Sequence, residues 1–220
     1  MILSYIFHAL YPPKCVLCTR ILSKEETGLC HSCRVETADF PDARIPLPHL
    51  ESWRALWYYE GNVRASLLRY KFHRRTAYAQ VYGQLLAVKL LQQPPQFDVM
   101  TWVPTGSLRQ RKRGYDQVAL LAKATAAELG CECLATLKKI RDNRPQSGMG
   151  SAAQRRANVL GVYQVICPED VAGKHVLLLD DVITTGATAG ECARVLLTAG
   201  AKSVHLACVA AANHQVKTSR

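Results

Sequence analysis

The sequence predicts an α/β protein that carries a small metal-binding module at its N-terminus. From Trp53 onward, segments with the periodicity of amphipathic helices alternate with short apolar runs typical of buried strands. Ahead of them, four cysteines form two Cys-x-x-Cys pairs, a spacing typical of metal sites. We therefore expect two parts, a metal-binding module with its linker over residues 1–50 and an α/β domain over residues 51–220.

Apolar stripes at helical spacing and apolar runs alternate in the predicted α/β domain. The stripes predict helices, and a proline pair or a glycine follows each of them as a stop signal. The runs lack strict alternation, which is typical of parallel strands buried on both faces. The expected helices lie at 78–90, 118–129 and 192–199, and the expected strands at 99–103, 175–179 and 203–209.

The composition is that of an ordinary folded protein and is strongly basic. Of the 220 residues, 49% are hydrophobic and 20% are charged, which excludes a disordered or fibrous chain. Lys and Arg number 28 against 17 Asp and Glu, so the formal net charge is +11. Such an excess predicts attraction to an anionic partner, whether a polyphosphate substrate, nucleic acid or acidic lipid.

The apolar start of the chain predicts neither export nor membrane insertion. Met1–Leu10 lacks a basic start and a small-residue cleavage site, and it is too short to span a bilayer. No other window approaches the roughly 20 apolar residues that a membrane helix needs. We therefore expect a cytoplasmic protein, with a short helix at Tyr5–Leu10 that ends before Pro12 and Pro13.

Cys15, Cys18, Cys30 and Cys33 form the pattern C-x2-C-x11-C-x2-C. Each pair can stand on a tight turn that points two thiolates at one ion, and two such turns close a tetrahedral zinc site with no open position. We therefore predict a structural zinc ion, which would supply folding energy to a segment with few apolar residues. The alternatives are reduced thiols in loops, a redox-active Cys-x-x-Cys, and replacement of one ligand by His31.

Two segments lack clear periodicity. Val35–Ser52 contains Pro41, Pro46 and Pro48, and we predict that it is a linker. Lys139–Gly161 is rich in Arg, Asn, Gly and Gln. A loop of this length inside a compact domain indicates either a functional lid or a tolerated insertion.

The most informative run extends from Val176 to Thr188. An apolar strand leads into Asp180 and Asp181, and a small, hydroxyl-rich turn then opens a helix near Gly186. In parallel sheets, ligands bind beyond the carboxyl ends of the strands. The turn can offer backbone N–H groups, hydroxyls and a helix N-terminus to a phosphate. The two carboxylates would repel that phosphate, so they are better suited to accept hydrogen bonds from ribose hydroxyls.

Other phosphate-binding motifs are excluded at this run. It lacks the lysine and the glycine spacing of a Walker-type loop, and the chain contains no G-x-G-x-x-G dinucleotide motif. The run instead resembles the motif with which type I phosphoribosyltransferases bind 5-phosphoribosyl 1-diphosphate (PRPP). The resemblance implies that Asp180 and Asp181 hold the ribose 2′ and 3′ hydroxyls. It implies further that the 5′-phosphate is held by Thr184, Thr185, Gly186, Ala187 and Thr188.

The wider chain is similar to the ComF family, whose members join an N-terminal cysteine module to a phosphoribosyltransferase domain and include proteins required for natural DNA uptake. This resemblance implies a type I phosphoribosyltransferase-like parallel sheet flanked by helices, and a link to natural competence. The chain departs from the family pattern at several positions, including Gly106 and Ser107 for His-Pro, Asp116 for Asn, Asn143 for Thr and Met149 for Leu. The matching blocks, besides the cysteines and the PRPP-binding motif, are 59–72, 103–117 and 146–158.

Basic residues near the predicted site are suited to bind the diphosphate that leaves during phosphoribosyl transfer. The strand that ends at Val103 should bring Pro104 and Thr105 beside the PRPP-binding motif, with a basic run that includes Arg113 directly after them. Phosphoribosyl transfer needs positioned cations, Mg²⁺ bound mainly through substrate oxygens, and exclusion of water. We therefore predict Mg²⁺ as a cofactor together with PRPP, Arg113 as a catalytic cation, and diphosphate contacts from Arg144 and Arg155 in the loop.

Two functions from different classes fit these features. The first is an enzyme that binds PRPP with Mg²⁺ and transfers its phosphoribosyl group. The second is a DNA-uptake factor whose basic surface and zinc module contact single-stranded DNA or a partner helicase without catalysis. Segment 104–160 carries 11 Lys and Arg against 4 Asp and Glu, which suits a phosphate backbone but also suits a PRPP pocket.

Overall fold

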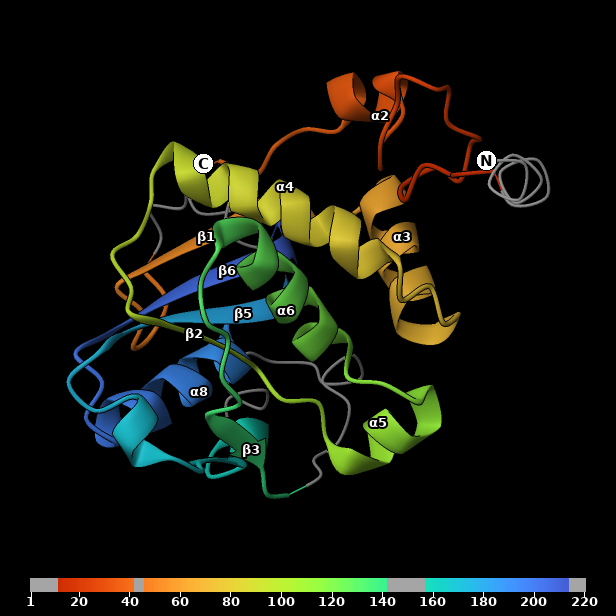
Figure 1. The fold of residues 1–220 in the computed structure, drawn as a ribbon. Coiled ribbons are helices and arrows are strands. Elements are labelled where there is room, and N and C mark those ends of the chain that lie inside the picture. Colours follow the sequence, from red (N-terminus) through yellow and green to blue (C-terminus); the bar gives the residue numbers. More distant parts are fainter. Residues whose placement is uncertain (1–11, 42–45, 142–156, 214–220) are drawn as a thin grey trace, which may run out of the picture.

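The computed structural model describes residues 12–41, 46–141 and 157–213 of the chain. A four-stranded parallel sheet in the order β1-β6-β5-β2 forms its centre, and a two-stranded antiparallel ribbon of β3 and β4 lies apart from it (Figure 1). This architecture confirms the expected α/β fold with a parallel sheet. The strands are β1 Ser52–Tyr58, β2 Val99–Trp102, β3 Leu137–Lys139, β4 Tyr163–Val165, β5 His175–Ile183 and β6 Ser203–Ala211.

Helices cover both faces of the sheet, which explains why its strands are apolar throughout. On β5, Leu177 and Leu179 join the cluster that contains helices α3, α4 and α6, while Val176 and Leu178 join the cluster that contains α8. The helices are α2 His31–Glu36, α3 Gly61–Phe72, α4 Tyr78–Gln92, α5 Ser107–Arg113, α6 Gln117–Leu129 and α8 Ala187–Thr198, with a 3₁₀ turn η2 at Pro168–Asp170.

The helices expected from periodicity are confirmed. The stripe at 78–90 lies in α4 and the stripe at 118–129 lies in α6, which ends at Gly130 with a left-handed φ of 63°. Helix α8 starts at Ala187, which confirms the helix expected to open near Gly186, and it contains most of the stripe at 192–199; Gly186 precedes it with a φ of 73°.

Strand β5 is longer than predicted. We expected the strand to end at Leu179 with the two aspartates beyond it, but β5 continues to Ile183 and contains both of them. The extra length arises because β6 is an equally long apolar neighbour, with Asp180 opposite Cys208 and Ile183 opposite Ala211 in the parallel register. The carboxylates therefore come from the rigid centre of the sheet instead of a loop.

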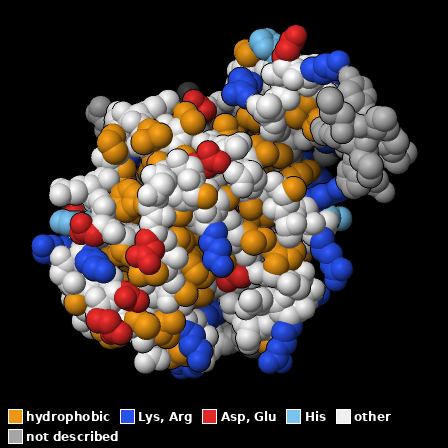
Figure 2. Space-filling model, in the orientation of Figure 1, with side chains coloured by type: hydrophobic (Ala, Val, Ile, Leu, Met, Phe, Trp, Pro, Cys, Tyr) orange, Lys and Arg blue, Asp and Glu red, His pale blue; other side chains and the backbone are white. Residues whose placement is uncertain are grey.

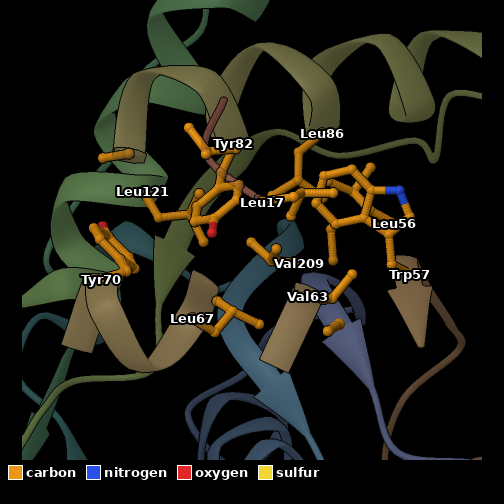
Figure 3. Close-up of a cluster of buried hydrophobic side chains, with 14 of the residues drawn as sticks. Leu17, Leu56, Trp57, Val63, Leu67, Tyr70, Tyr82, Leu86, Leu121 and Val209 are labelled. Carbon is orange, nitrogen blue, oxygen red and sulfur yellow. The ribbon is translucent and has the colours of Figure 1, made fainter. Parts of the chain in front are cut away.

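The described part of the cysteine module shares one hydrophobic cluster with helices α3 and α4. Leu17 is buried among Leu67, Tyr82 and Leu86 (Figure 3). Residues that we predicted to be a linker also pack on the α/β domain. Phe40 stacks on the rings of Trp53 and Tyr58, with centroids 5.4 and 4.8 Å away.

Two of the predictions concern residues that the structure does not describe. The short helix predicted at Tyr5–Leu10 lies outside the described residues, as does most of the predicted loop 139–161. In the part of the chain that the structure describes, no helix combines the length and the apolar character needed to cross a bilayer.

Candidate active site and metal centre

Asp180 and Asp181 are consecutive residues near the C-terminal end of β5, and both line a cleft of about 720 Å³. Their exposed fractions are only 8% and 4%. Lys71 Nζ forms an ion pair with Asp181 Oδ1 at 2.8 Å, and Gln117 Nε2 donates to Asp181 Oδ2 at 3.1 Å. Each oxygen of the Asp181 carboxylate therefore has one protein donor.

Asp180 lies in a setting that opposes its ionisation. Burial, followed by the neighbouring charge of Asp181, raises the pKa of Asp180 to about 8, although the charge of Lys71 acts in the opposite direction. The backbone N–H of Asp181 donates to Asp180 Oδ1 at 2.7 Å. The surroundings of Asp180 therefore favour its protonated form.

The turn after β5 has the form of a phosphate cradle. Gly186 has a left-handed φ of 73° and directly precedes the twelve-residue helix α8, whose N-terminus faces the turn. A side chain at Gly186 would meet Leu47 at 2.7 Å, so only glycine fits there. A small cavity of about 20 Å³ adjoins the turn, lined in part by Asp180, Thr184, Gly186, Ala187 and Thr188.

Asp116 holds the loop after β2 against the site. Its carboxylate caps helix α6 by accepting from the N–H groups of Val118 and Ala119, and it also accepts from the N–H of Thr105 at 3.0 Å and from the Thr105 hydroxyl at 3.1 Å. An Asn side chain has one acceptor oxygen where Asp has two. The aspartate that departs from the family pattern is therefore well suited to fix the loop.

Cations surround the cleft on two sides. Helix α3 and the segment after it contribute Arg64, Lys71 and Arg74, and helix α5 contributes Arg109, Lys112 and Arg113. In Figure 2, Lys and Arg side chains gather at the right and lower right of the face shown, over these helices. The Arg113 guanidinium stacks over the Phe72 ring with 5.0 Å to the centroid, and burial lowers the pKa of Arg113.

The structure brings most of the predicted site residues together. Pro104, Thr105, Arg113, Thr188 and the two aspartates line the large cleft, and Thr184, Gly186 and Ala187 line the adjoining cavity. Thr185 accepts a hydrogen bond from the Ala187 N–H at 3.4 Å. Arg144 and Arg155 lie outside the described residues.

Lys71 and Gln117 both contact Asp181, and the sequence identified neither of them as a site residue. In the sequence Lys71 belongs to a basic group with Arg74 and Arg75, about a hundred residues before the aspartates. The helical spacing of α3 offered one signal, because Lys71 falls one turn after Leu67, which is buried. Nothing local in the sequence indicates that this helix ends beside β5.

The four cysteine thiols form a metal centre. The Sγ atoms of Cys15, Cys18, Cys30 and Cys33 all lie within 4.8 Å of one another, and those of Cys18 and Cys30 are 3.7 Å apart. Tetrahedral zinc with bonds of about 2.3 Å requires sulfur–sulfur distances of about 3.8 Å, so the geometry fits. A hydrogen bond from the Cys33 N–H to Cys30 Sγ, 3.4 Å long, lowers the pKa of Cys30 to about 6, which favours the thiolate. Within the described residues, no other cluster of three or more His, Cys, Asp or Glu forms such a centre.

Models of two protein families match the chain. Residues 119–220 match the phosphoribosyl transferase domain, and residues 6–43 match the double zinc ribbon domain. Together with the parallel sheet and the cysteine centre, these matches define a phosphoribosyltransferase-type protein with an N-terminal zinc ribbon, and they support a structural zinc ion.

The relatives extend over almost the whole chain. The DNA utilization protein YhgH of Salmonella typhi is 30% identical over 90% of this chain and 96% of its own length, and Competence protein F of Haemophilus influenzae is 24% identical over 88% and 94%. The chain belongs to the ComF family, which contains these proteins. A ribose-phosphate pyrophosphokinase of Methanosarcina acetivorans is 58% identical over 40 residues, 18% of this chain and 14% of that protein.

Solved structures show weaker similarity. A glutamine PRPP amidotransferase from B. subtilis covers 64% of this chain and 30% of its own, with 24% identity and a TM-score of 0.44. The allosteric regulatory enzyme of purine biosynthesis covers 64% and 29%, with 23% identity and a TM-score of 0.43.

Replacing Cys30 by Ser should remove zinc and destabilise the protein. Elemental analysis should find about one zinc ion per chain in the wild type and little in Cys30→Ser, because a tetrahedral site that loses one thiolate binds the metal weakly. Thermal unfolding should occur at a lower temperature in this variant. Cys167→Ser, which lies outside the cluster, is the control and should keep both properties. Unchanged zinc content in Cys30→Ser would contradict the assignment.

Replacing Asp180 by Asn should stabilise the protein increasingly as the pH rises. Because the folded protein holds a proton on Asp180 up to about pH 8, whereas the unfolded chain releases it near the ordinary pKa of 3.8, wild-type stability is lost as the pH increases through this window. Asparagine cannot ionise and avoids this loss. Urea unfolding at several pH values should show the advantage of Asp180→Asn growing from about pH 5 to about pH 8. An advantage that is constant or that shrinks with pH would contradict the protonation state assigned to Asp180.

Proposed function

We propose that the cleft binds PRPP together with Mg²⁺ and that the protein is a phosphoribosyltransferase. The observation that supports this function most strongly is the buried pair of Asp180 and Asp181 between a helix N-terminus and a basic wall. A sugar that carries hydroxyls on one edge and phosphates at both ends matches this arrangement.

The ribose and its 5′-phosphate would lie over the end of β5. In this proposal the carboxylates of Asp180 and Asp181 accept hydrogen bonds from the 2′ and 3′ hydroxyls. The 5′-phosphate binds in the turn formed by residues 184–188, where N–H groups at the start of α8 and the threonine hydroxyls donate to it. Gly186 supplies the left-handed backbone conformation that this turn requires.

The diphosphate would lie between the loop after β2 and helix α5. Thr105 is held there by Asp116, and the guanidinium of Arg113 is one of the cations that line this side of the cleft. Charge develops on the diphosphate as its bond to the anomeric carbon breaks, so fixed cations stabilise the transition state more than the bound substrate. Mg²⁺ would arrive with the substrate oxygens and neutralise the same charge.

The names of the relatives suggest the biological setting. Because two relatives are named for DNA utilization and for competence, we propose that this protein acts in the cytoplasm in natural competence. A second function is favoured by one further observation. The ring of Phe72 is 61% exposed beside Arg74 and Arg113, an arrangement that suits stacking and phosphate contacts with single-stranded DNA, either directly or with a helicase as partner.

Calorimetric titration with PRPP and Mg²⁺ tests the enzymatic proposal. The wild type should bind, and both Asp180→Asn and Asp181→Asn should weaken binding by about a hundredfold, because each places an amide NH₂ donor where a carboxyl oxygen would accept from a ribose hydroxyl in a buried site. Glu169→Gln, an exposed acid on η2, is the matched control and should bind like the wild type. Wild-type protein that binds no PRPP would overturn the proposal.

Fluorescence anisotropy with single-stranded DNA tests the second function. The apparent affinity should fall steeply as salt increases, and replacement of Arg111, Lys112 and Arg113 by Gln should reduce the slope of log affinity against log salt by about two, since about 0.7 counterions are released per phosphate contact on single strands. Lys174→Gln and Lys202→Gln, which lie outside the cleft, form the control. An affinity that does not depend on salt would exclude this function.

A further inference from the structure

Lys71 lies beside Asp181, one of the two aspartates that are proposed to bind the ribose. Its ammonium group is 2.8 Å from Asp181 Oδ1, and its side chain is only 18% exposed. Burying a lysine is unfavourable unless it is paired and held in good geometry, because the ammonium group loses its hydration. The ion pair therefore needs support from the surrounding structure.

The zinc module supports helix α3, which carries Lys71, through hydrogen bonds. The Ser66 hydroxyl donates to the carbonyl of Val16, and the Arg69 guanidinium donates to the carbonyls of Val16 and Leu17 at 3.0 and 2.5 Å. Val16 and Leu17 lie between the zinc ligands Cys15 and Cys18, so these carbonyls belong to the metal-binding turn itself. The helix that carries Lys71 is thus held at two positions, two and five residues before the lysine.

A second set of hydrogen bonds holds the end of α3 against helix α6. The hydroxyl of Tyr70 donates to the carbonyl of Gln117 at 2.5 Å, and the hydroxyl of Tyr115 donates to the carbonyl of Tyr70. The side chain of Gln117 in turn donates to Asp181 Oδ2. Lys71 and Gln117 therefore approach Asp181 from two helices that are bonded to each other.

The result is a carboxylate with a fixed plane and spare acceptor capacity. A carboxylate offers about four lone-pair sites, and Asp181 uses one on each oxygen for Lys71 and Gln117. The remaining sites can accept ribose hydroxyls while the ion pair stays in place. Preorganised acceptors bind more tightly because the ligand need not order them.

We propose that Lys71 is a positioning residue of the pentose-binding site, where its ammonium group fixes the Asp181 carboxylate for a ribose hydroxyl and remains paired with it when the ligand is bound. This inference rests on the proposed binding of PRPP and deepens it, because it assigns a cation outside the PRPP-binding motif to the recognition of the sugar. It also links the zinc module to that site through one helix.

Other charged and titratable groups near Asp180 and Asp181 also contribute to the electrostatics of the site. Asp116 on the cap of α6 adds negative charge, and Arg113 on α5 adds positive charge toward Asp181. The remaining titratable neighbours are neutral at ordinary pH because burial raises their pKa. They are Tyr70, Tyr163, Cys192 and Cys208. Loss of the Lys71 charge therefore removes a cation that lowers the pKa of Asp180, and the pKa of Asp180 should rise further.

Calorimetry of PRPP with Mg²⁺ on Lys71→Met and Lys71→Arg tests the inference. Lys71→Met should bind PRPP about tenfold or more weakly at neutral pH, because a buried carboxylate loses its ionic partner. The deficit should shrink as the pH rises, since alkali ionises the aspartates that the lysine no longer stabilises. Lys71→Arg should recover most of the affinity. Lys202→Met, an exposed lysine outside the cleft, is the control.

A double-mutant cycle with Asp181→Asn separates positioning from a general loss of structure. If Lys71 acts through Asp181, Lys71→Met should have little further effect on PRPP affinity in the Asp181→Asn protein. Equal effects in both backgrounds, wild-type affinity in Lys71→Met, or tighter binding by it would each overturn the inference. Tighter binding would mean that the lysine competes with the sugar.

A measurement without ligand keeps this inference distinguishable from the proposed function. Carbon-13 NMR of the aspartate carboxyls should show a higher pKa for Asp180 in Lys71→Met than in the wild type. A wild type that fails to bind PRPP but shows this shift would overturn the proposed function and with it the role in sugar binding. A wild type that binds PRPP, with no effect of Lys71→Met on either readout, would overturn only the role of Lys71.

Discussion

The structure depends on how two adjacent carboxylates are buried at the centre of a parallel sheet. Asp180 and Asp181 belong to β5, which has β6 and β2 as neighbours and helices on both faces. Burial of two like charges is unfavourable. The raised pKa of Asp180 favours its neutral form, and the Asp181 carboxylate is paired with Lys71. Two carboxyl groups held in this way can accept hydrogen bonds from a ligand with neighbouring hydroxyls, which is what the proposed function requires.

The zinc module and the α/β domain act as one folding unit. Leu17 enters the cluster beneath helices α3 and α4, and Arg69 on α3 binds the carbonyls of the zinc-binding turn. The metal therefore stabilises more than the thirty residues around it, because it fixes the surface against which α3 packs. Since α3 also carries Lys71, the metal centre and the cleft are linked by a single rigid element.

Local patterns in the sequence predicted the fold well and the site in part. Helices α4 and α6, and the strand and turn of the run from Val176 to Thr188, could be inferred from the sequence. The patterns that predict them are formed by residues close together in the chain. The length of β5 could not, because it is set by pairing with β6, and the packing of Phe40 depends on Trp53 and Tyr58. The pairing of Lys71 with Asp181 joins positions more than a hundred residues apart, and only the tertiary structure brings them together.

The most direct test of this account is a crystal structure determined with PRPP and Mg²⁺ in excess. The account predicts ribose hydroxyls within hydrogen-bond distance of Asp180 and Asp181, the 5′-phosphate in the turn before α8, and Lys71 still beside Asp181. An empty cleft at saturating ligand, or a sugar bound away from the two aspartates, would contradict it.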